Sequence, residues 1–156
     1  MTPGIDAASK AGIFHNIHEY EHDSSSAGYG NEAAEKLGVD PSRIFKTLVV
    51  SVDGKTLVVG VVPVTGMLSM KLIAKAAGGK KASMADPQEV QRRTGYVLGG
   101  VSPLGQKNRL KTLIDASAEA FDTIYVSAGR RGLEIELSPE DLARLTGGQL
   151  VPLQQA

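Results

Sequence analysis

Two apolar runs on either side of Asp53-Gly54 constrain the fold of this chain more than any other feature. Residues 45–51 and 55–62 are rich in Val, Leu and Thr, which favour β-strands. The Asp-Gly dipeptide between them is a strong signal for a tight hairpin turn. The second run has few polar residues, which predicts a central strand that is covered on both faces. The hairpin also places Lys46 near the start of a strand whose neighbour is buried.

Capping signals on both sides of the hairpin predict short helices and further short strands. Thr2-Pro3, Asp86-Pro87 and Ser138-Pro139 each combine an N-cap residue with proline at the first helical position, and Ser69 is a further N-cap residue. We expect helices at residues 3–12, 31–37, 70–77, 87–93 and 139–145, with one helical turn at 118–121. We expect further strands at residues 13–21, 80–84, 112–115, 123–127 and 133–137, and a loop at 23–30.

The expected strands outnumber the helices, and several of them are joined by short turns. This pattern predicts an α+β fold with a mixed, largely antiparallel sheet flanked by short helices. No Gly-x-Gly-x-x-Gly motif follows a strand, which argues against a dinucleotide-binding fold. There is no internal repeat and no long linker, so we expect residues 1–156 to form a single domain.

Composition excludes several classes of function. The chain has no cysteine, which rules out a disulfide framework, a thiolate metal site and a cysteine nucleophile. Its 17 basic and 17 acidic residues cancel, whereas a protein that grips long nucleic acids is usually basic. We therefore expect a nucleic-acid partner to be touched locally or delivered by another protein. No apolar run can span a bilayer and no signal peptide is recognisable, so we expect a cytoplasmic protein without a membrane partner.

Residues 96–105 form a glycine-rich stretch that is a candidate binding loop. Gly99 and Gly100 can adopt positive φ and let another molecule approach the main chain, and Pro103 stiffens the loop. Exposed amides in such a loop can hold a carbonyl or phosphate oxygen. The alternative is an ordinary tight turn between two strands.

Other candidate residues each have a structural alternative. Lys46 alone reads as a solvated charge, Tyr20 as a half-buried aromatic residue and Glu134 as the polar face of a strand. Strand alternation puts His18 and His22 on one face without His15, so we expect no metal site. Four basic clusters could be solvated surface or could form a collar for phosphates around a cleft. They are Lys80-Lys81, Arg92-Arg93, Lys107/Arg109/Lys111 and Arg130-Arg131.

Several unusual motifs occur together in a fixed order along the chain. They resemble the YbaK/EbsC family of freestanding aminoacyl-tRNA deacylases, which is related to the editing insertion of bacterial prolyl-tRNA synthetases. The resemblance is closest to the branch that hydrolyses Cys-tRNA(Pro). It implies a mixed single-domain fold, a site between the sheet and the glycine loop, and neither a metal nor an organic cofactor. The motifs are Tyr20-Glu21-His22, Phe45-Lys46-Thr47-Leu48, Met84-Ala85-Asp86-Pro87, the stretch from Gly95 to Gln106, and Gly132-Leu133-Glu134-Ile135.

The resemblance also implies roles for individual residues. It implies catalytic roles for Lys46, Tyr20 and Gly100, with Gly100 beside the substrate carbonyl. Glu134 stands where the family commonly has aspartate, one methylene shorter. The remaining expected substrate-binding residues are Gly99, Ser102, Pro103, Ser127 and His22.

The expected substrate is tRNA(Pro) mischarged with cysteine and bound through its acceptor end. Prolyl-tRNA synthetase is a further expected partner, which would present the substrate. Two alternatives stay open: a deacylase for another small amino acid such as alanine or serine, or a non-catalytic aminoacyl- or nucleotide-binding module of a synthetase. No Ser-His-Asp order or nucleophile elbow is present, which leaves a positioned water or a group on the substrate as the nucleophile. The resemblance favours the thiol of the esterified cysteine.

Overall fold

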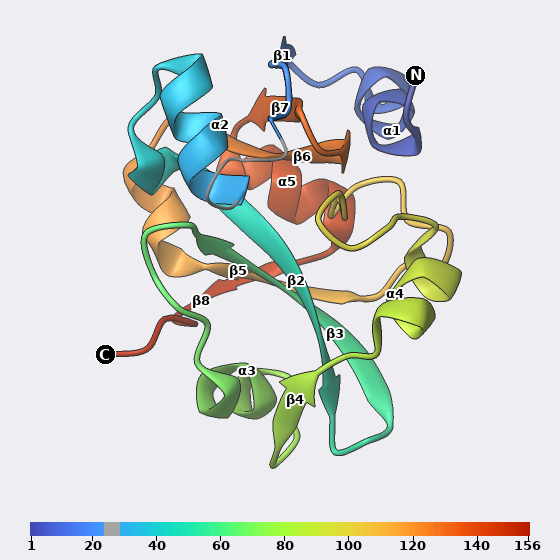
Figure 1. Cartoon of the computed structure of the whole chain (residues 1–156). Helices are drawn as coiled ribbons and strands as arrows, with labels where there is room; N and C mark the ends of the chain where they lie inside the picture. The colour runs from blue at the N-terminus through green and yellow to red at the C-terminus, as the bar shows by residue number, and fades with distance from the viewer. Residues whose placement is uncertain (24–28) are drawn as a thin grey trace.

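The computed structural model describes residues 1–23 and 29–156, and Figure 1 shows their arrangement. Most of the loop expected at residues 23–30 lies outside the described residues, and its last two residues begin a helix. The helical elements are α1 (Pro3–Ala11), α2 (Tyr29–Leu37), η1 (Pro41–Arg43), α3 (Met70–Ala76), α4 (Pro87–Thr94), η2 (Ala116–Ala120) and α5 (Pro139–Thr146). The predicted N-caps are confirmed, because the side chains of Thr2, Ser69, Asp86 and Ser138 each accept a backbone N–H of their helix.

A five-stranded mixed sheet contains the predicted hairpin. Its order is β4-β2-β3-β5-β8, with the first two pairings antiparallel and the last two parallel. The central position of β3 is confirmed, since every residue after Thr56 in that strand is buried. Its strands are β2 (Phe45–Val52), β3 (Thr56–Pro63), β4 (Ala82–Met84), β5 (Lys111–Asp115) and β8 (Gln149–Val151).

The hairpin turn is one residue longer than the Asp-Gly signal predicts. Asp53 and Gly54 both have positive φ, 55° and 66°, and the N–H of Lys55 donates to the oxygen of Val52 at 3.0 Å. Val52 pairs with Thr56, however, so three residues rather than two connect the strands. The positive φ at both central positions matches the twist that a hairpin needs.

A three-stranded antiparallel sheet of order β1-β7-β6 forms the second layer. Its strands are β1 (His15–Glu19), β6 (Ile124–Arg130) and β7 (Leu133–Leu137). An isolated parallel bridge between Ile44 and Tyr125 joins the two sheets where the chain enters β2. Ile135, Val126 and Phe45 belong to one apolar core that both sheets share.

The glycine stretch is a loop that joins α4 to β5, and no strand forms at its apolar start. Val97 and Leu98 are more than half exposed, whereas residues 100–104 are buried. None of the helices within the described residues is both long and apolar enough to cross a membrane.

Candidate functional site

The face of the three-stranded sheet that points away from the shared core carries a row of polar side chains. Glu134 of β7 lies directly opposite His18 of β1 and Ser127 of β6. Side chains at directly opposed positions project to the same face, so these three are neighbours. Glu134 is fully buried and Ser127 is 3% exposed. A buried carboxylate in this row needs polar or cationic neighbours, which makes it a candidate site.

Tyr20 follows β1 at the end of this row. Its N–H donates to the oxygen of Gly132 at 2.9 Å, which fixes its backbone beside β7. Its hydroxyl is buried and has no hydrogen-bond partner among the described residues. Burial raises the pKa of Tyr20, and the nearby carboxylates of Glu134 and Glu32 raise it further. A buried hydroxyl beside a carboxylate, without a partner, is a place where a polar group of a substrate would bind.

Lys46 lies at the second position of β2, opposite Val62. Ile44, two residues earlier, packs in one cluster with Tyr20 and Tyr125. Because side chains alternate along an extended chain, Lys46 points to the same side as Ile44. Strand alternation therefore directs Lys46 to the side on which Ile44 packs with Tyr20 and Tyr125.

The two glycines of the loop have different structural roles. Gly99 has φ of 91°, in the region that favours glycine. Gly100 donates its N–H to the oxygen of Val97 at 2.9 Å, and a β-carbon there would lie 2.9 Å from Cα of Arg130. The expected use of the Gly100 amide is therefore corrected, because that amide closes a turn. A glycine at this position lets the loop pack closely on the β6–β7 turn, next to the segment that holds Tyr20.

Ser102 and Pro103 are buried parts of the loop. The Ser102 Oγ accepts the N–H of Leu104 at 3.1 Å, and the Ser102 carbonyl accepts Nε2 of Gln106 at 3.0 Å. The Tyr96 hydroxyl donates to the Leu104 oxygen at 2.6 Å. These bonds hold the loop together, and they give Ser102 a structural role.

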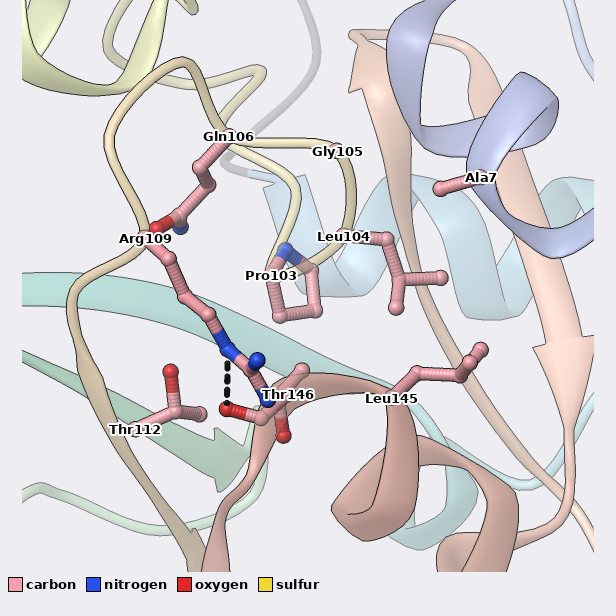
Figure 2. A pocket seen from close by; sticks show the side chains of 9 residues that line it. All are labelled: Ala7, Pro103, Leu104, Gly105, Gln106, Arg109, Thr112, Leu145 and Thr146. Atoms are coloured by element: carbon pink, nitrogen blue, oxygen red, sulfur yellow. Dashed lines mark hydrogen bonds between the residues drawn. The ribbon is translucent and has the colours of Figure 1, made fainter. Parts of the chain in front are cut away.

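A hollow of about 140 Å³ lies against residues 103–106 of the loop, and Figure 2 shows the residues that line it. Pro103 borders it together with Ala7 of α1 and Thr146 of α5. Arg109 extends across it and donates its Nε–H to the Thr146 oxygen at 3.1 Å (Figure 2). Lys46, Tyr20 and Glu134 do not line this hollow. Of the predicted site residues, Glu134 and Ser127 lie elsewhere, on the polar face of the three-stranded sheet, whereas Pro103 lines this hollow.

His22 contacts a buried acid that the sequence analysis missed. Its Nδ1 lies 2.7 Å from Oε1 of Glu32, whose side chain is completely buried in α2. The other oxygen of Glu32 accepts the N–H of Asp23 at 2.7 Å, and Arg131 lies 3.6 Å from Oε1. The sequence signal is weak: an acid in the first turn of a short helix, followed by two alanines small enough for close packing. His22, expected as a substrate contact, is a partner of Glu32.

The histidines have separate partners, so they do not form a metal site. Nδ1 of His15 lies 2.8 Å from the oxygen of Ile13, and Nε2 of His18 lies 2.9 Å from Oε1 of Glu136. Across residues 1–23 and 29–156, no three potential ligands converge. The polar face offers the hydroxyl of Tyr20 and the carboxylate of Glu134 as groups that can bind a polar ligand.

Comparison with known proteins identifies the family. The model of the aminoacyl-tRNA editing domain matches residues 27–145. This chain belongs to that family. The editing domain is 43% identical over 137 residues to EbsC of Enterococcus faecalis, named as a proposed Cys-tRNA(Pro)/Cys-tRNA(Cys) deacylase, with 86% of this chain and 83% of EbsC covered.

Two further relatives bear on the fold and the substrate. The editing domain is 31% identical over 110 residues to the multifunctional Ser/Thr-tRNA deacylase ProXp-y of Escherichia coli, covering 68% of this chain and 66% of that protein. A solved structure described as a candidate trans-editing enzyme for prolyl-tRNA synthetase superposes with a TM-score of 0.85. The identity is 23%, and 98% of this chain and 96% of that chain are covered. This likeness confirms the expected fold, and the family match confirms the resemblance seen in the sequence.

Proposed function

We propose that this editing domain is a trans-editing deacylase that hydrolyses the ester between a mischarged cysteine and tRNA(Pro). The observation that carries the proposal is the buried, unpartnered hydroxyl of Tyr20 beside the fully buried Glu134, with Lys46 on the same side. The 43% identity to EbsC supports cysteine as the esterified amino acid.

Each of the three side chains has a role that follows from its chemistry. The Lys46 ammonium holds a phosphate or ester oxygen of the acceptor end. The Tyr20 hydroxyl, whose pKa is raised first by burial and then by Glu134, is protonated at neutral pH as any phenol is, so it can donate to the ester carbonyl. Glu134, as a carboxylate, attracts the substrate ammonium group. In this scheme Tyr20 takes the oxygen-holding role that the sequence analysis gave to the Gly100 amide.

The nucleophile in this proposal is the substrate's own thiol. A cysteine thiol has a pKa near 8.5, and its thiolate is a strong nucleophile. The sulfur attacks the ester carbonyl of the same residue, the carbon–oxygen bond to the ribose breaks, and the leaving ribose oxygen takes up a proton. Water then opens the resulting thiolactone to free cysteine. The enzyme supplies orientation and charge stabilisation.

The deciding experiment compares hydrolysis of Cys-tRNA(Pro) and Ser-tRNA(Pro), which differ only in sulfur and oxygen. We expect fast turnover of the cysteine ester and loss of turnover when its thiol is alkylated. Comparable rates on both esters would replace the thiol mechanism with a positioned water. That result would also favour the second candidate function, a Ser-tRNA deacylase, which the relationship to the Escherichia coli Ser/Thr-tRNA deacylase supports.

Removal of Lys46 tests whether the domain is an enzyme at all. Loss of one group that stabilises the transition-state charge typically costs about 10²–10³ in rate. We expect Lys46→Ala to lose activity on that scale, while Lys10→Ala, exposed on α1, retains it. If the native protein does not exceed spontaneous hydrolysis, the enzyme proposal fails and a non-catalytic binding module takes its place.

Selection of tRNA(Pro) is proposed to depend on prolyl-tRNA synthetase, which would present the mischarged product. The name of EbsC includes both tRNA(Pro) and tRNA(Cys), which agrees with weak discrimination by that protein alone. We expect the isolated domain to deacylate Cys-tRNA(Cys) as readily as Cys-tRNA(Pro). A strong preference between them without the synthetase would contradict this proposal.

A further inference from the structure

Although the net charge of the chain is zero, its basic and acidic residues are concentrated in different segments of the sequence. Residues 43–111 contain twelve lysines and arginines but only three acidic residues, an excess of nine positive charges. Residues 1–42 have five more acidic than basic residues, and residues 112–156 have four more. The basic segment folds into β2, β3, α3, β4, α4 and the glycine loop.

The fold converts this separation into two ends of the molecule. In Figure 1, the hairpin turn, α3 and β4 lie at the end opposite α2 and the three-stranded sheet. Lys55 and Lys111 line one hollow at the hairpin end, together with Gly78 and Gly79. Lys80 and Lys81 follow directly on Gly79, and all four lysines are exposed. We call Lys55, Lys80, Lys81 and Lys111 the basic end.

The acid nearest to these lysines is already occupied by backbone groups. The Asp53 carboxylate accepts the N–H of Lys81 at 2.9 Å and the N–H of Lys80 at 3.1 Å. These amide hydrogen bonds, first that of Lys81, lower the pKa of Asp53. None of the four ammonium groups forms an ion pair with a carboxylate in the described ranges. The basic end is thus a cluster of exposed cations available to an external polyanion.

The distance from the polar face shows that the basic end is not a collar around the site. Val52, which adjoins the hairpin turn, is the sixth residue after Lys46 along β2. At about 3.3 Å per residue, this amounts to roughly 20 Å. A ligand that reached both places would have to be a long polyanion. RNA duplexes are bound mainly through contacts to phosphates and 2′-hydroxyls, and phosphate contacts with lysine give non-specific affinity.

We propose that the basic end binds the phosphate backbone of the tRNA acceptor arm while the acceptor end reaches Lys46. This inference rests on the proposed function for its partner. It assigns a tRNA contact to a surface remote from the chemistry, and it explains how a protein of zero net charge can hold a polyanion. A purely solvated surface is the competing explanation.

The test measures binding of uncharged tRNA by fluorescence anisotropy over a range of salt concentrations. The variant is Lys80→Gln/Lys81→Gln, which keeps the turn intact because Asp53 is held by the amides of these residues and not by their side chains. The matched control is Lys10→Gln/Arg144→Gln, which removes two exposed charges from α1 and α5. Equal melting temperatures of the two variants exclude unfolding as a cause.

We expect the slope of log K against log salt concentration to become shallower by roughly 1.5 to 2 in the variant, since each duplex contact contributes about 0.9. Affinity at about 0.1 M salt should fall roughly tenfold or more, with little change in the control. Equal slopes in variant and control would overturn the proposal and leave a solvated surface.

A second measurement separates the basic end from the site. The ratio of kcat/KM on full Cys-tRNA(Pro) to that on a cysteine ester of a single-stranded ACCA oligonucleotide should fall roughly tenfold in the variant. An unchanged ratio would mean that the lysines do not contact the acceptor arm. If the native protein hydrolyses neither ester, the proposed function fails, but binding of uncharged tRNA still tests the basic end.

Discussion

The imidazole of His22 contacts the buried carboxylate of Glu32, with 2.7 Å between Nδ1 and Oε1. His22 lies just beyond Tyr20, and Glu32 lies in the first turn of α2. The same carboxylate lies 3.6 Å from Arg131 in the β6–β7 turn. One buried acid therefore joins the helix, the segment after β1 and the turn that bears on the glycine loop.

We expect Glu32→Ala to lower the free energy of unfolding by roughly 2–4 kcal/mol, because the side chains around it lose a buried anionic partner. Deacylation should fall as well, since Tyr20 depends on the same segment for its position. Urea unfolding and single-turnover rates measure the two effects. Glu35→Ala, exposed on the same helix, should change stability by less than about 0.5 kcal/mol; an equal loss in both variants would contradict the role of Glu32.

The two loop glycines should respond differently to a methyl group. Gly99→Ala meets no atom within 4 Å but keeps a strained positive φ, so we expect a loss of about 1 kcal/mol in stability. Gly100→Ala places its β-carbon 2.9 Å from the backbone of Arg130, so the loop must move from the β6–β7 turn. We expect a larger loss of stability together with loss of activity. Thermal melting and rates on both variants provide the check, and a Gly100→Ala protein with native melting would refute the close packing.

The carboxylate of Glu134 should control the titration of Tyr20. Burial raises the pKa of Tyr20 first and Glu134 adds to it, so Glu134→Gln should lower that pKa while leaving it above the ordinary value. Tyrosinate absorbance, with Tyr20→Phe as the reference, measures the shift. Glu136→Gln is the matched control. Burial is the larger cause of the raised pKa of Tyr125 and Glu136 is the next, so this variant should leave the pKa of Tyr20 unchanged. An unaltered titration of Tyr20 in Glu134→Gln would remove the charge contact on which the proposed site depends.

Tyr96 should make the fold sensitive to alkaline pH. Burial raises its pKa to about 12, so the native state holds the phenol proton more tightly than the unfolded chain does. The stability from this group is complete below about pH 10 and is lost as pH rises towards 12. Tyr96→Phe should flatten this decline and lose roughly 1–2 kcal/mol at neutral pH, because the hydrogen bond to the Leu104 oxygen is removed. Urea unfolding measured across this pH range checks the prediction. An equally steep loss of stability in the Tyr96→Phe variant would contradict it.

Local signals predicted most of the fold because they act over a few residues. The position of the hairpin at Asp53-Gly54 and the caps at Thr2, Ser69 and Ser138 depend on neighbouring backbone groups and were predicted correctly, although the turn has one residue more than predicted. Strand β8 was missed because its parallel pairing with β5 is set by distant contacts. The Asp115 carboxylate, 38 residues before Leu153, accepts the N–H of that residue at 2.8 Å.

The candidate site was predictable in its residue types but not in their partners. A glycine that accommodates a substrate and a glycine that accommodates its own chain look alike in sequence, and Gly100 proved to contact Arg130. Glu32 was missed because an acid in a polar helical turn normally faces water. Its burial depends on His22 and Arg131, which reach it from other elements.

The four exposed lysines of the basic end make the charge distribution of the protein uneven despite its zero net charge. In the field of a polyanion such a molecule experiences a torque, so it turns its hairpin end forward before any contact forms. Association rates should then depend on ionic strength as if the protein were charged. A protein of zero net charge can thus still meet a polyanion in a preferred orientation, because that orientation depends on where the charges lie and not on their sum.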